Sequence, residues 1–386
     1  MKYDVTIIGS GPAGAYCARN LAEKGLKVLI LDKKKFPREK HCGGLISKKA
    51  LRVLKEDFVK EYGVKKRYNP IFKIILTSGE RKTFLEKNDS VGIIVKRKEF
   101  DELLTSQAID KGAIFMDGCE YQFHTLNKSY YEIHTTKGTF SSDYIIGADG
   151  VFSRVAKVSG LRQSFRNWEM GMAVSCEIPK ELVIEKGGVE FIFLKILGGM
   201  GWCFSGTDFV NIGVGGYALD SKKILLAANE LMIKRLKNKN NVINLRASFL
   251  PAGGRKRTIA KEKVFLVGDA AGLIDAFSGE GIYYALTSGK IVAEVILKNQ
   301  TATDYEEQCY RKFLNEFRLS ILMSIVLGER NNIFKQGFDK KLLEAFDKIL
   351  TIAPKNGCYK ELIFNIARHG FSPVFPYLWI KSLLFA

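Results

Sequence analysis

The stretch VTIIGSGPAG at residues 5–14 decides the fold class of this chain. Its four leading residues predict a short buried strand, and Gly9, Gly11 and Gly14 form the pattern G-x-G-x-x-G directly after that strand. A helical pattern follows, and the apolar run at residues 27–31 predicts a second strand. This order of strand, helix and strand is a βαβ unit, and it predicts an α/β fold with a Rossmann-type domain.

The glycine turn also predicts a binding site for a dinucleotide. Glycines at these positions allow a tight turn, close approach of the backbone to a pyrophosphate, and close packing of the helix on the sheet. The helix that begins at Pro12 and Ala13 adds free N–H groups and the positive end of its dipole. Asp32 ends the second strand, where a carboxylate accepts the ribose hydroxyls and disfavours a 2′-phosphate, and Lys33 follows it at the same site.

Two later segments predict the rest of this site. Residues 143–150 read DYIIGADG, and residues 263–281 read KVFLVGDAAGLIDAFSGEG before a further helical pattern. Two further binding segments beside one glycine fingerprint indicate a cofactor long enough to contact all three. The residues expected at the cofactor from these segments are Asp149, Gly268, Asp269, Gly279, Gly281 and Ile282.

In order and spacing, the three segments resemble the FAD motifs of the p-hydroxybenzoate hydroxylase class of flavoproteins. The resemblance implies that FAD is the cofactor, that Asp269 accepts a hydrogen bond from its ribityl chain, and that residues 279–282 face the flavin pyrimidine ring. A helix dipole aimed there stabilises the anion that forms when flavin is reduced. The resemblance also implies that Arg97 lies near the chain that links the two halves of FAD; the alternative is a surface arginine at a helix start.

Three places narrow the resemblance to the geranylgeranyl reductase family. The loop at residues 35–44, KFPREKHCGG, resembles the family's loop in which a Cys-Gly pair lies close to the isoalloxazine. The paired segments at residues 201–204 and 211–215 resemble the strands that line its prenyl cavity, and residues 268–282 resemble its Gly-Asp-Ala-Ala-Gly element. Two departures border the expected substrate space: Ser-Gly follows Phe204 where the family has Pro-Lys, and the proline that precedes the Gly-Glu-Gly triplet is absent.

These patterns give a set of expected site residues. The residues expected to be catalytic are Cys42, Gly43, Trp202 and Glu280, and Cys42, Gly43 and Gly44 are also expected at the cofactor. The residues expected to line the substrate cavity are Phe191, Phe193, Trp202, Phe204, Gly213 and Gly215. The Cys42 thiol has three roles open to it beside a flavin, which are packing, tuning the ring and supplying a proton, and a buried inert thiol is the alternative. Glu280 has the alternative of capping a helix start.

Composition and charge exclude several other classes. The 386 residues are 46% hydrophobic with 36 Gly and 8 Pro, which is typical of a folded chain and excludes collagen-like and disordered classes. The net charge of +19 attracts polyanions, but no zinc-finger, RNA-recognition or basic-zipper motif accompanies it, so nucleic acid is not an expected partner. The seven cysteines show no C-x-x-C and no cluster with histidine, so neither disulfides nor a metal site are expected.

The same patterns predict three regions. We expect a discontinuous FAD-binding domain at residues 1–75, 95–165 and 255–300, an antiparallel-sheet substrate domain at residues 76–94 and 166–254, and a C-terminal helical region at residues 301–386. No apolar run is long enough to span a bilayer, and the N-terminus lacks a signal-peptide pattern, so we expect a cytoplasmic protein. Apolar faces of the C-terminal helices, together with the basic charge, indicate contact with a membrane surface as an additional expectation.

The leading functional expectation is an FAD-dependent oxidoreductase that reduces carbon–carbon double bonds of an isoprenoid chain of the geranylgeranyl type. No second G-x-G-x-x-G follows a strand and opens a helix, so electrons are expected from an external donor, either a nicotinamide or a small redox protein. Two alternatives share the fold: a flavin-dependent monooxygenase or halogenase that acts on an aromatic or polyketide-like substrate, and a quinone-linked electron-transfer flavoprotein.

Overall fold

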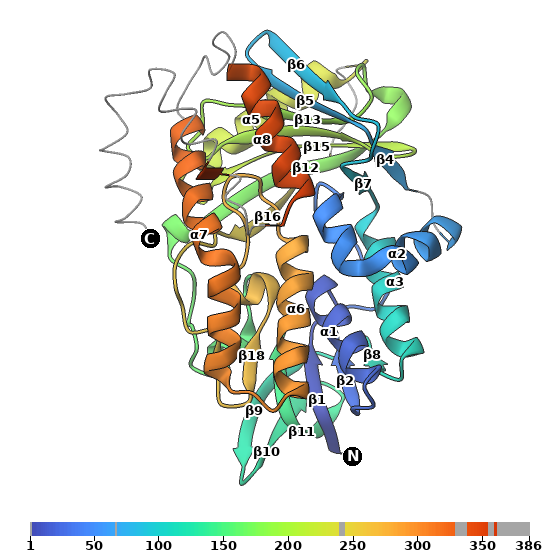
Figure 1. The fold of residues 1–386 in the computed structure, drawn as a ribbon, viewed down its shortest axis with the longest axis vertical. Helices are drawn as coiled ribbons and strands as arrows, with labels where there is room; N and C mark the ends of the chain where they lie inside the picture. Colours follow the sequence, from blue (N-terminus) through green and yellow to red (C-terminus); the bar gives the residue numbers. More distant parts are fainter. Residues whose placement is uncertain (1, 66–67, 239–243, 329–337, 354–358, 361–386) are drawn as a thin grey trace.

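The computed structural model describes residues 2–65, 68–238, 244–328, 338–353 and 359–360. In these residues a large sheet flanked by helices lies below a second large sheet, and a small third sheet lies to the side of both (Figure 1). The expected α/β class with an added antiparallel sheet and C-terminal helices is confirmed.

The lower sheet contains the glycine fingerprint. Its strand order is β17-β18-β11-β1-β2-β8, and β10 and β9 continue antiparallel from β11. Its strands are β1 (Lys2–Ile8), β2 (Val28–Leu31), β8 (Ile114–Met116), β9 (Tyr121–Asn127), β10 (Tyr130–Thr135), β11 (Gly138–Gly147), β17 (Ala260–Lys261) and β18 (Val264–Leu266). The pairs of β1 with β2 and β11 are parallel, and their apolar runs are buried because helices cover the sheet.

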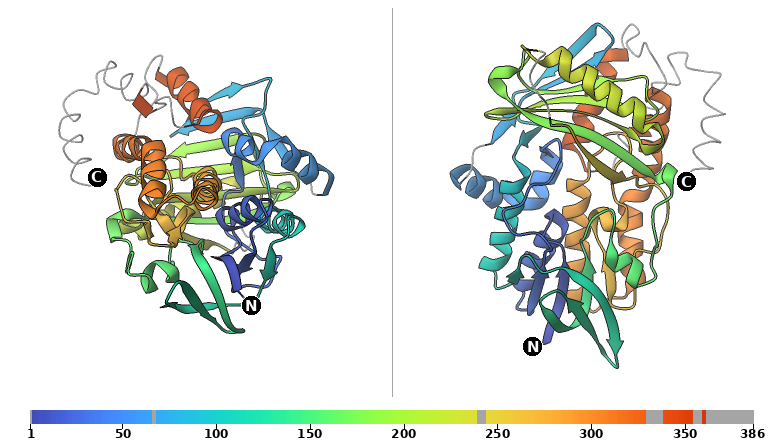
Figure 2. Two further views of the ribbon diagram at one scale, coloured as in Figure 1. Left: turned by 60° about the horizontal axis from the view of Figure 1, so that its bottom comes forward. Right: turned by 180° about the vertical axis from the view of Figure 1, so that it is seen from behind.

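The upper sheet is mostly antiparallel, in the order β16-β12-β15-β14-β13-β5-β6. Its strands are β5 (Lys73–Ser78), β6 (Arg81–Glu86), β12 (Met170–Pro179), β13 (Val189–Phe193), β14 (Met200–Ser205), β15 (Phe209–Tyr217) and β16 (Arg246–Pro251). Helix α5 (Ser221–Arg235) lies across the outer face of this sheet, which is best seen from behind (Figure 2, right). The opposite face is turned toward the lower sheet.

The remaining elements are a small third sheet and the helices that pack on and beside the two large sheets. The small third sheet consists of β3 (Leu45–Ser47), β4 (Asn69–Ile71) and β7 (Gly92–Ile94). The other helices are α1 (Pro12–Ala22), α2 (Lys48–Lys65), α3 (Arg97–Asp110), α4 (Arg154–Val158), α6 (Ile282–Leu297), α7 (Ala302–Gly328) and α8 (Phe338–Thr351). Helices α1, α3 and α6 lie side by side against the lower sheet, and α7 runs beside α6 toward the upper sheet (Figure 1).

The domain boundaries stay a prediction, and the topology suggests one change to them. The expected boundary at residues 75/76 falls inside β5, and all of β5 pairs with β13 in the upper sheet. We therefore propose to move this boundary to the start of β5. Residues 361–386 of the expected C-terminal helical region lie outside the described residues. Within the described residues, no helix combines the length and the hydropathy that crossing a membrane requires.

Candidate active site

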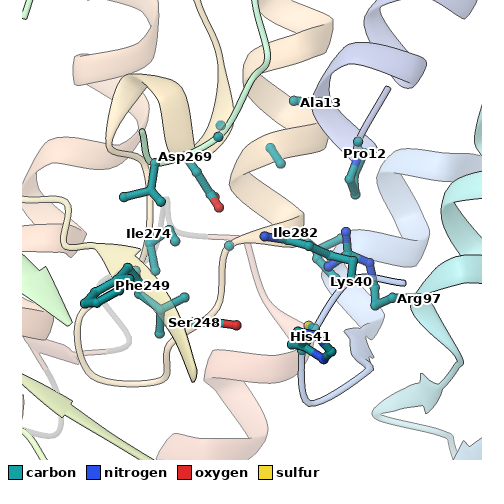
Figure 3. A pocket seen from close by; sticks show the side chains of 18 of the residues that line it. Pro12, Ala13, Lys40, His41, Arg97, Ser248, Phe249, Asp269, Ile274 and Ile282 are labelled. Carbon is teal, nitrogen blue, oxygen red and sulfur yellow. The ribbon is translucent and has the colours of Figure 1, made fainter. Parts of the chain in front are cut away.

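A cavity of about 570 Å³ lies between the lower and upper sheets. Segments that are far apart in the chain form its walls: the glycine turn at residues 8–13, the loop at residues 38–43, and residues 267–282. Figure 3 shows Pro12, Lys40 and Arg97 on one side of this cavity, with Asp269 and Ile274 on the other. Residues 148–150 also line it, so the three predicted cofactor segments are brought together around one space.

The three glycines of the turn have different surroundings. A Cβ on Gly9 would lie 2.4 Å from the Ala148 oxygen, and a Cβ on Gly14 would lie 2.0 Å from the Gly9 oxygen, so both positions need glycine for packing. A Cβ on Gly11 would meet only the Arg38 Nη2 atom, 3.8 Å away. Gly11 also precedes α1 and has no side-chain cap. The start of α1 therefore presents uncapped N–H groups to open space, which is the arrangement that binds phosphate.

Asp32 is fixed at the end of β2. Its Oδ2 accepts a hydrogen bond from the Ser10 N–H at 3.0 Å, and its Oδ1 accepts one from the Lys34 N–H at 2.9 Å. Both Asp32 and Lys33 line the cavity, at the positions expected for a ribose. The carboxylate thus keeps its orientation through the backbone and still faces the cavity.

Two arginines share one buried carboxylate beside the glycine turn. Arg97 donates from Nε and Nη2 to Asp101 at 2.9 and 3.0 Å, and Arg38 Nη1 donates to the same carboxylate at 3.0 Å. Burial alone would lower the pKa of Arg97, but Asp101, with Cys42 beside it, raises that pKa. Arg97 is 8% exposed and lines the cavity, so it is not a surface arginine.

Arg38 and Asp101 were missed by the sequence analysis. The spacing of Asp101 four residues after Arg97 in an expected helix was the available signal for that pair. Nothing local in the sequence connects Arg38 to Asp101. Lys40, which also lines the cavity, was missed for the same reason.

Asp149 acts within the chain as a helix cap. Its carboxylate accepts hydrogen bonds from the Ser153 hydroxyl at 2.6 Å and from the N–H groups of Arg154 and Val155 at 2.7 and 3.1 Å. Burial raises the pKa of Asp149, and these hydrogen bonds oppose the rise. Asp149 lines the cavity as expected, but its oxygens are occupied at the start of α4.

Asp269 is the unoccupied acceptor of the site. It lies in a short 3-10 turn, Gly268–Ala271, and its carboxylate accepts no hydrogen bond from the part of the chain that the structure describes. Burial raises the pKa of Asp269, and Lys40 and Arg97 partly offset this effect. A half-buried carboxylate without a partner is costly unless a ligand donates to it.

The start of α6 faces the same space as Asp269. Gly281 caps the helix without a side-chain hydrogen bond, and Ile282, its first residue, lines the cavity together with Gly279. Gly279 has a φ of +68° and open space where a Cβ would stand. The uncapped N–H groups beside Gly11, the free acceptor at Asp269 and this helix start suit the chemistry of the pyrophosphate, ribityl chain and flavin of FAD.

The catalytic role expected of Glu280 stays a prediction, and its side chain is not among those that line the cavity. The Ser47 hydroxyl donates to its Oε1, and the Lys49 ammonium lies 2.6 Å from its Oε2. Lys49 is 5% exposed and sits over the rings of Tyr283 and Tyr284. Glu280 therefore ties the loop before α6 to the start of α2, and we propose a structural role for it.

An aromatic wall on the upper sheet lines the cavity and contacts the Cys42 loop. Trp202, Phe204 and Phe191 all line the cavity, and the rings of Phe191 and Phe204 meet edge to face with centroids 5.2 Å apart. Cys42 and Gly43 line it beside these rings. A Cβ on Gly43 would lie 3.0 Å from the Phe204 ring, so the loop lies directly against this wall.

Three expected site residues lie just outside the cavity. Gly213 is covered by the Trp202 indole, because a Cβ there would be 2.3 Å from the ring, whereas Gly215 lines the cavity. Phe193 is not among the residues that line the cavity, although Phe191 is; both rings contact Phe346 of α8, with centroids 6.0 and 4.8 Å away. Gly44 has a φ of +77° and makes the turn that brings Cys42 and Gly43 to the cavity.

Comparison with known proteins agrees with this geometry. A family model described as an FAD binding domain matches residues 2–185. A protein of Methanosarcina barkeri is 32% identical over 332 residues, covering 85% of this chain and 83% of that protein. A relative from Methanosphaera stadtmanae, named digeranylgeranylglycerophospholipid reductase 3, is 29% identical and covers 81% of each chain.

Two solved structures share the fold. A geranylgeranyl bacteriochlorophyll reductase-like protein of Thermoplasma acidophilum matches with a TM-score of 0.77 at 20% identity, covering 97% of this chain and 98% of that one. The flavin-dependent brominase Bmp2 matches with a TM-score of 0.74 at 18% identity, covering 96% and 99%. At these identities the structures support the fold alone, whereas the sequence relatives support the family. The chain therefore belongs to the geranylgeranyl reductase family of FAD-dependent oxidoreductases, with FAD as its cofactor.

Proposed function

We propose that this enzyme reduces carbon–carbon double bonds of an isoprenoid chain, with electrons supplied through FAD. The observation that carries the proposal is the aromatic wall of Trp202, Phe204 and Phe191, which lines the cavity beside the Cys42 loop. An apolar wall of this kind suits a hydrocarbon chain. The name of the Methanosphaera stadtmanae relative, a digeranylgeranylglycerophospholipid reductase, supports the same substrate class.

The proposed cofactor site uses the residues around the cavity described above. The N–H groups at the start of α1, next to Gly11, would hold the pyrophosphate, Asp32 the ribose, and Asp269 the ribityl chain. Arg38 and Arg97 add positive charge beside the pyrophosphate. FAD, when reduced, supplies the hydride that an alkene needs.

The residues of the chain contribute binding, orientation and exclusion of water. An isolated alkene is a poor electrophile, so holding it close to the hydride donor in a dry space is the main way to accelerate the reaction. Trp202 and Phe204 bury apolar area and exclude water from that space. We propose the Cys42 Sγ as the proton donor, because Cys42 lines the cavity next to the Trp202 wall.

We propose that an external donor, either a nicotinamide or a small redox protein, supplies the electrons. The single G-x-G-x-x-G turn is occupied by the FAD site, and the chain has no second such turn that opens a helix. The net charge of +19 favours approach of an anionic donor and also contact with an anionic membrane surface. Co-sedimentation with anionic and neutral lipid vesicles tests the membrane contact, and equal binding to both would remove the electrostatic argument.

Reoxidation of the anaerobically photoreduced enzyme by different acceptors tests the proposed function. A lipid that carries geranylgeranyl chains should reoxidise the flavin, whereas its fully saturated analogue should not. The fold is shared with a flavin-dependent brominase, so the alternative of O₂ chemistry predicts fast reoxidation by O₂ with modification of an added phenol. Reoxidation by a quinone alone would instead favour an electron-transfer flavoprotein.

A further inference from the structure

We infer that Asn211 is a positioning residue that fixes the Cys42 loop against the Trp202 wall of the cavity. Asn211 lies in β15, is 2% exposed, and stands directly opposite Phe204 on the same face of the sheet. The Trp202 indole Nε1–H donates to its Oδ1 at 2.8 Å, and its Nδ2 donates to the Cys42 main-chain oxygen at 2.9 Å. One buried amide thus joins the Cys42 loop to the aromatic wall against which the loop packs.

The chemistry of the three groups fixes the orientation of this amide. An indole N–H can only donate, and a main-chain oxygen can only accept. Only an amide placed with its oxygen toward Trp202 and its nitrogen toward Cys42 satisfies both. A carboxylate at position 211 would keep the bond to Trp202 and lose the bond to Cys42, and a leucine would lose both.

The loop that Asn211 holds is also restrained on either side of Cys42: the Val95 N–H donates to the Gly44 oxygen at 3.0 Å, and Arg246 Nη1 lies 3.3 Å from His41 Nε2. Gly43 and Gly44 follow Cys42, and glycine loses more conformational freedom on ordering than any other residue. Gly43 packs on the ring of Phe204, and the Gly44 N–H turns back to the Cys42 sulfur at 3.5 Å. The Asn211 amide is therefore the side-chain anchor that ties the backbone of this loop to the upper sheet.

This anchor sets the width of the cavity beside the thiol. Trp202 and Cys42 both line the cavity, while Asn211 does not, so it acts through the two residues it holds. The inference concerns only contacts within the chain and does not depend on which acceptor the enzyme reduces. The sequence around Asn211 predicts a strand but not its contact with Cys42, because 169 residues separate the two along the chain.

Alkylation of Cys42 by iodoacetamide tests the inference. We would measure its rate by mass spectrometry of the peptide that contains Cys42, with FAD bound and after its removal, in the wild type and in Asn211→Asp and Asn211→Leu. Cys176 is the internal reference, since it pairs with Ile212 on the same strands and is also half-buried. Asn69→Asp is the matched control, because its Nδ2 donates in the same way to the Ser205 main-chain oxygen at 2.6 Å.

We expect alkylation of Cys42 to become about fivefold faster in both Asn211 variants, the effect of losing one hydrogen bond that closes the loop. The rate at Cys176, and the rate at Cys42 in Asn69→Asp, should match those of the wild type. An unchanged Cys42 rate in the Asn211 variants would overturn the inference. Parallel acceleration at Cys42 and Cys176 would also overturn it, because Asn211 would then merely stabilise the sheet. Should Asn211→Asp fail to fold, Asn211→Leu decides by the same criteria.

Discussion

Individual glycines in the fingerprint have separable roles. Gly11 faces open space at the start of α1, whereas Gly14 packs against the oxygen of Gly9. The same substitution at the two positions should therefore affect different properties. A substitution at Gly11 should weaken FAD binding, and a substitution at Gly14 should lower the stability of the fold.

We predict that Gly11→Ala weakens FAD binding about tenfold and leaves the stability of the cofactor-free protein nearly unchanged. The added methyl group projects into the proposed phosphate cradle and touches only a flexible arginine end. Titration of FAD by flavin fluorescence measures the binding, and a tenfold loss corresponds to about 1.4 kcal/mol.

Gly14→Ala is the matched comparison. Its Cβ would stand 2.0 Å from a main-chain oxygen, so we expect a loss of unfolding free energy of about 1–3 kcal/mol in urea. If Gly11→Ala destabilised the cofactor-free protein as much as Gly14→Ala, Gly11 would be a packing glycine and not part of a cradle.

Asp269 should oppose the stability of the cofactor-free protein. Burial raises the pKa of its carboxyl group, so the charged form at pH 7 disfavours the folded state. We predict that Asp269→Asn is more stable than the wild type at pH 7 without FAD. This difference should shrink as the pH falls and the wild-type carboxyl group takes up its proton.

The same variant should bind FAD about five- to tenfold more weakly, because a neutral amide oxygen replaces a charged acceptor. Thermal unfolding at pH 7 and pH 5 and an FAD titration provide the three readings. A less stable Asp269→Asn apoprotein with unchanged FAD affinity would show that the carboxylate serves the fold and not the cofactor.

At the scale of elements, the β9–β10 hairpin contains a histidine that should make the protein acid-sensitive. His124 on β9 is half-buried, its Nδ1 lies 2.6 Å from the Tyr121 hydroxyl, and burial lowers its pKa to about 4. In the unfolded chain a histidine takes up a proton near pH 6.5. Stability from the neutral ring is therefore present above pH 6.5 and is lost as the pH falls toward 4.

We predict that acidification lowers the unfolding free energy of His124→Gln by about 1–2 kcal/mol less than that of the wild type. This difference is smaller than the full pKa shift would give, because the ring is partly exposed. Urea unfolding of both proteins at pH 7.5 and pH 4.5 gives the comparison. The wild type should lose more unfolding free energy between these values than the variant does. Equal losses would mean that the ring takes up its proton without cost in the folded hairpin.

The elements also show what sequence patterns could and could not predict. The order β1, α1 and β2 follows from hydrophobic periodicity and glycine placement, which are local properties. Alternation along β13 places Phe191 and Phe193 on one face, and both rings contact Phe346 of α8, a contact that no local pattern indicates; of the two, Phe191 lines the cavity. The contacts of Glu280 could not be predicted for a related reason, because its partners Ser47 and Lys49 precede it by more than 200 residues.

At the scale of the whole molecule, function depends on bringing distant segments to one cavity. The glycine turn, the Cys42 loop, the strands with Trp202 and Phe204, and the turn with Asp269 come from four parts of the chain. Motifs in the sequence predict each of these segments. They do not predict the hydrogen bonds between segments, such as those of Arg38 with Asp101 and of Asn211 with Cys42. These links form between side chains that only the tertiary fold brings together.

The mass of the lipid product after a single turnover tests the central claim most directly. The FAD-loaded enzyme would be photoreduced without air and mixed with an equimolar lipid that carries geranylgeranyl chains. The account predicts a lipid heavier by two hydrogen atoms, in an amount equal to the flavin reoxidised. A lipid of unchanged mass, with the flavin still reduced or reoxidised only on admission of O₂, would contradict it.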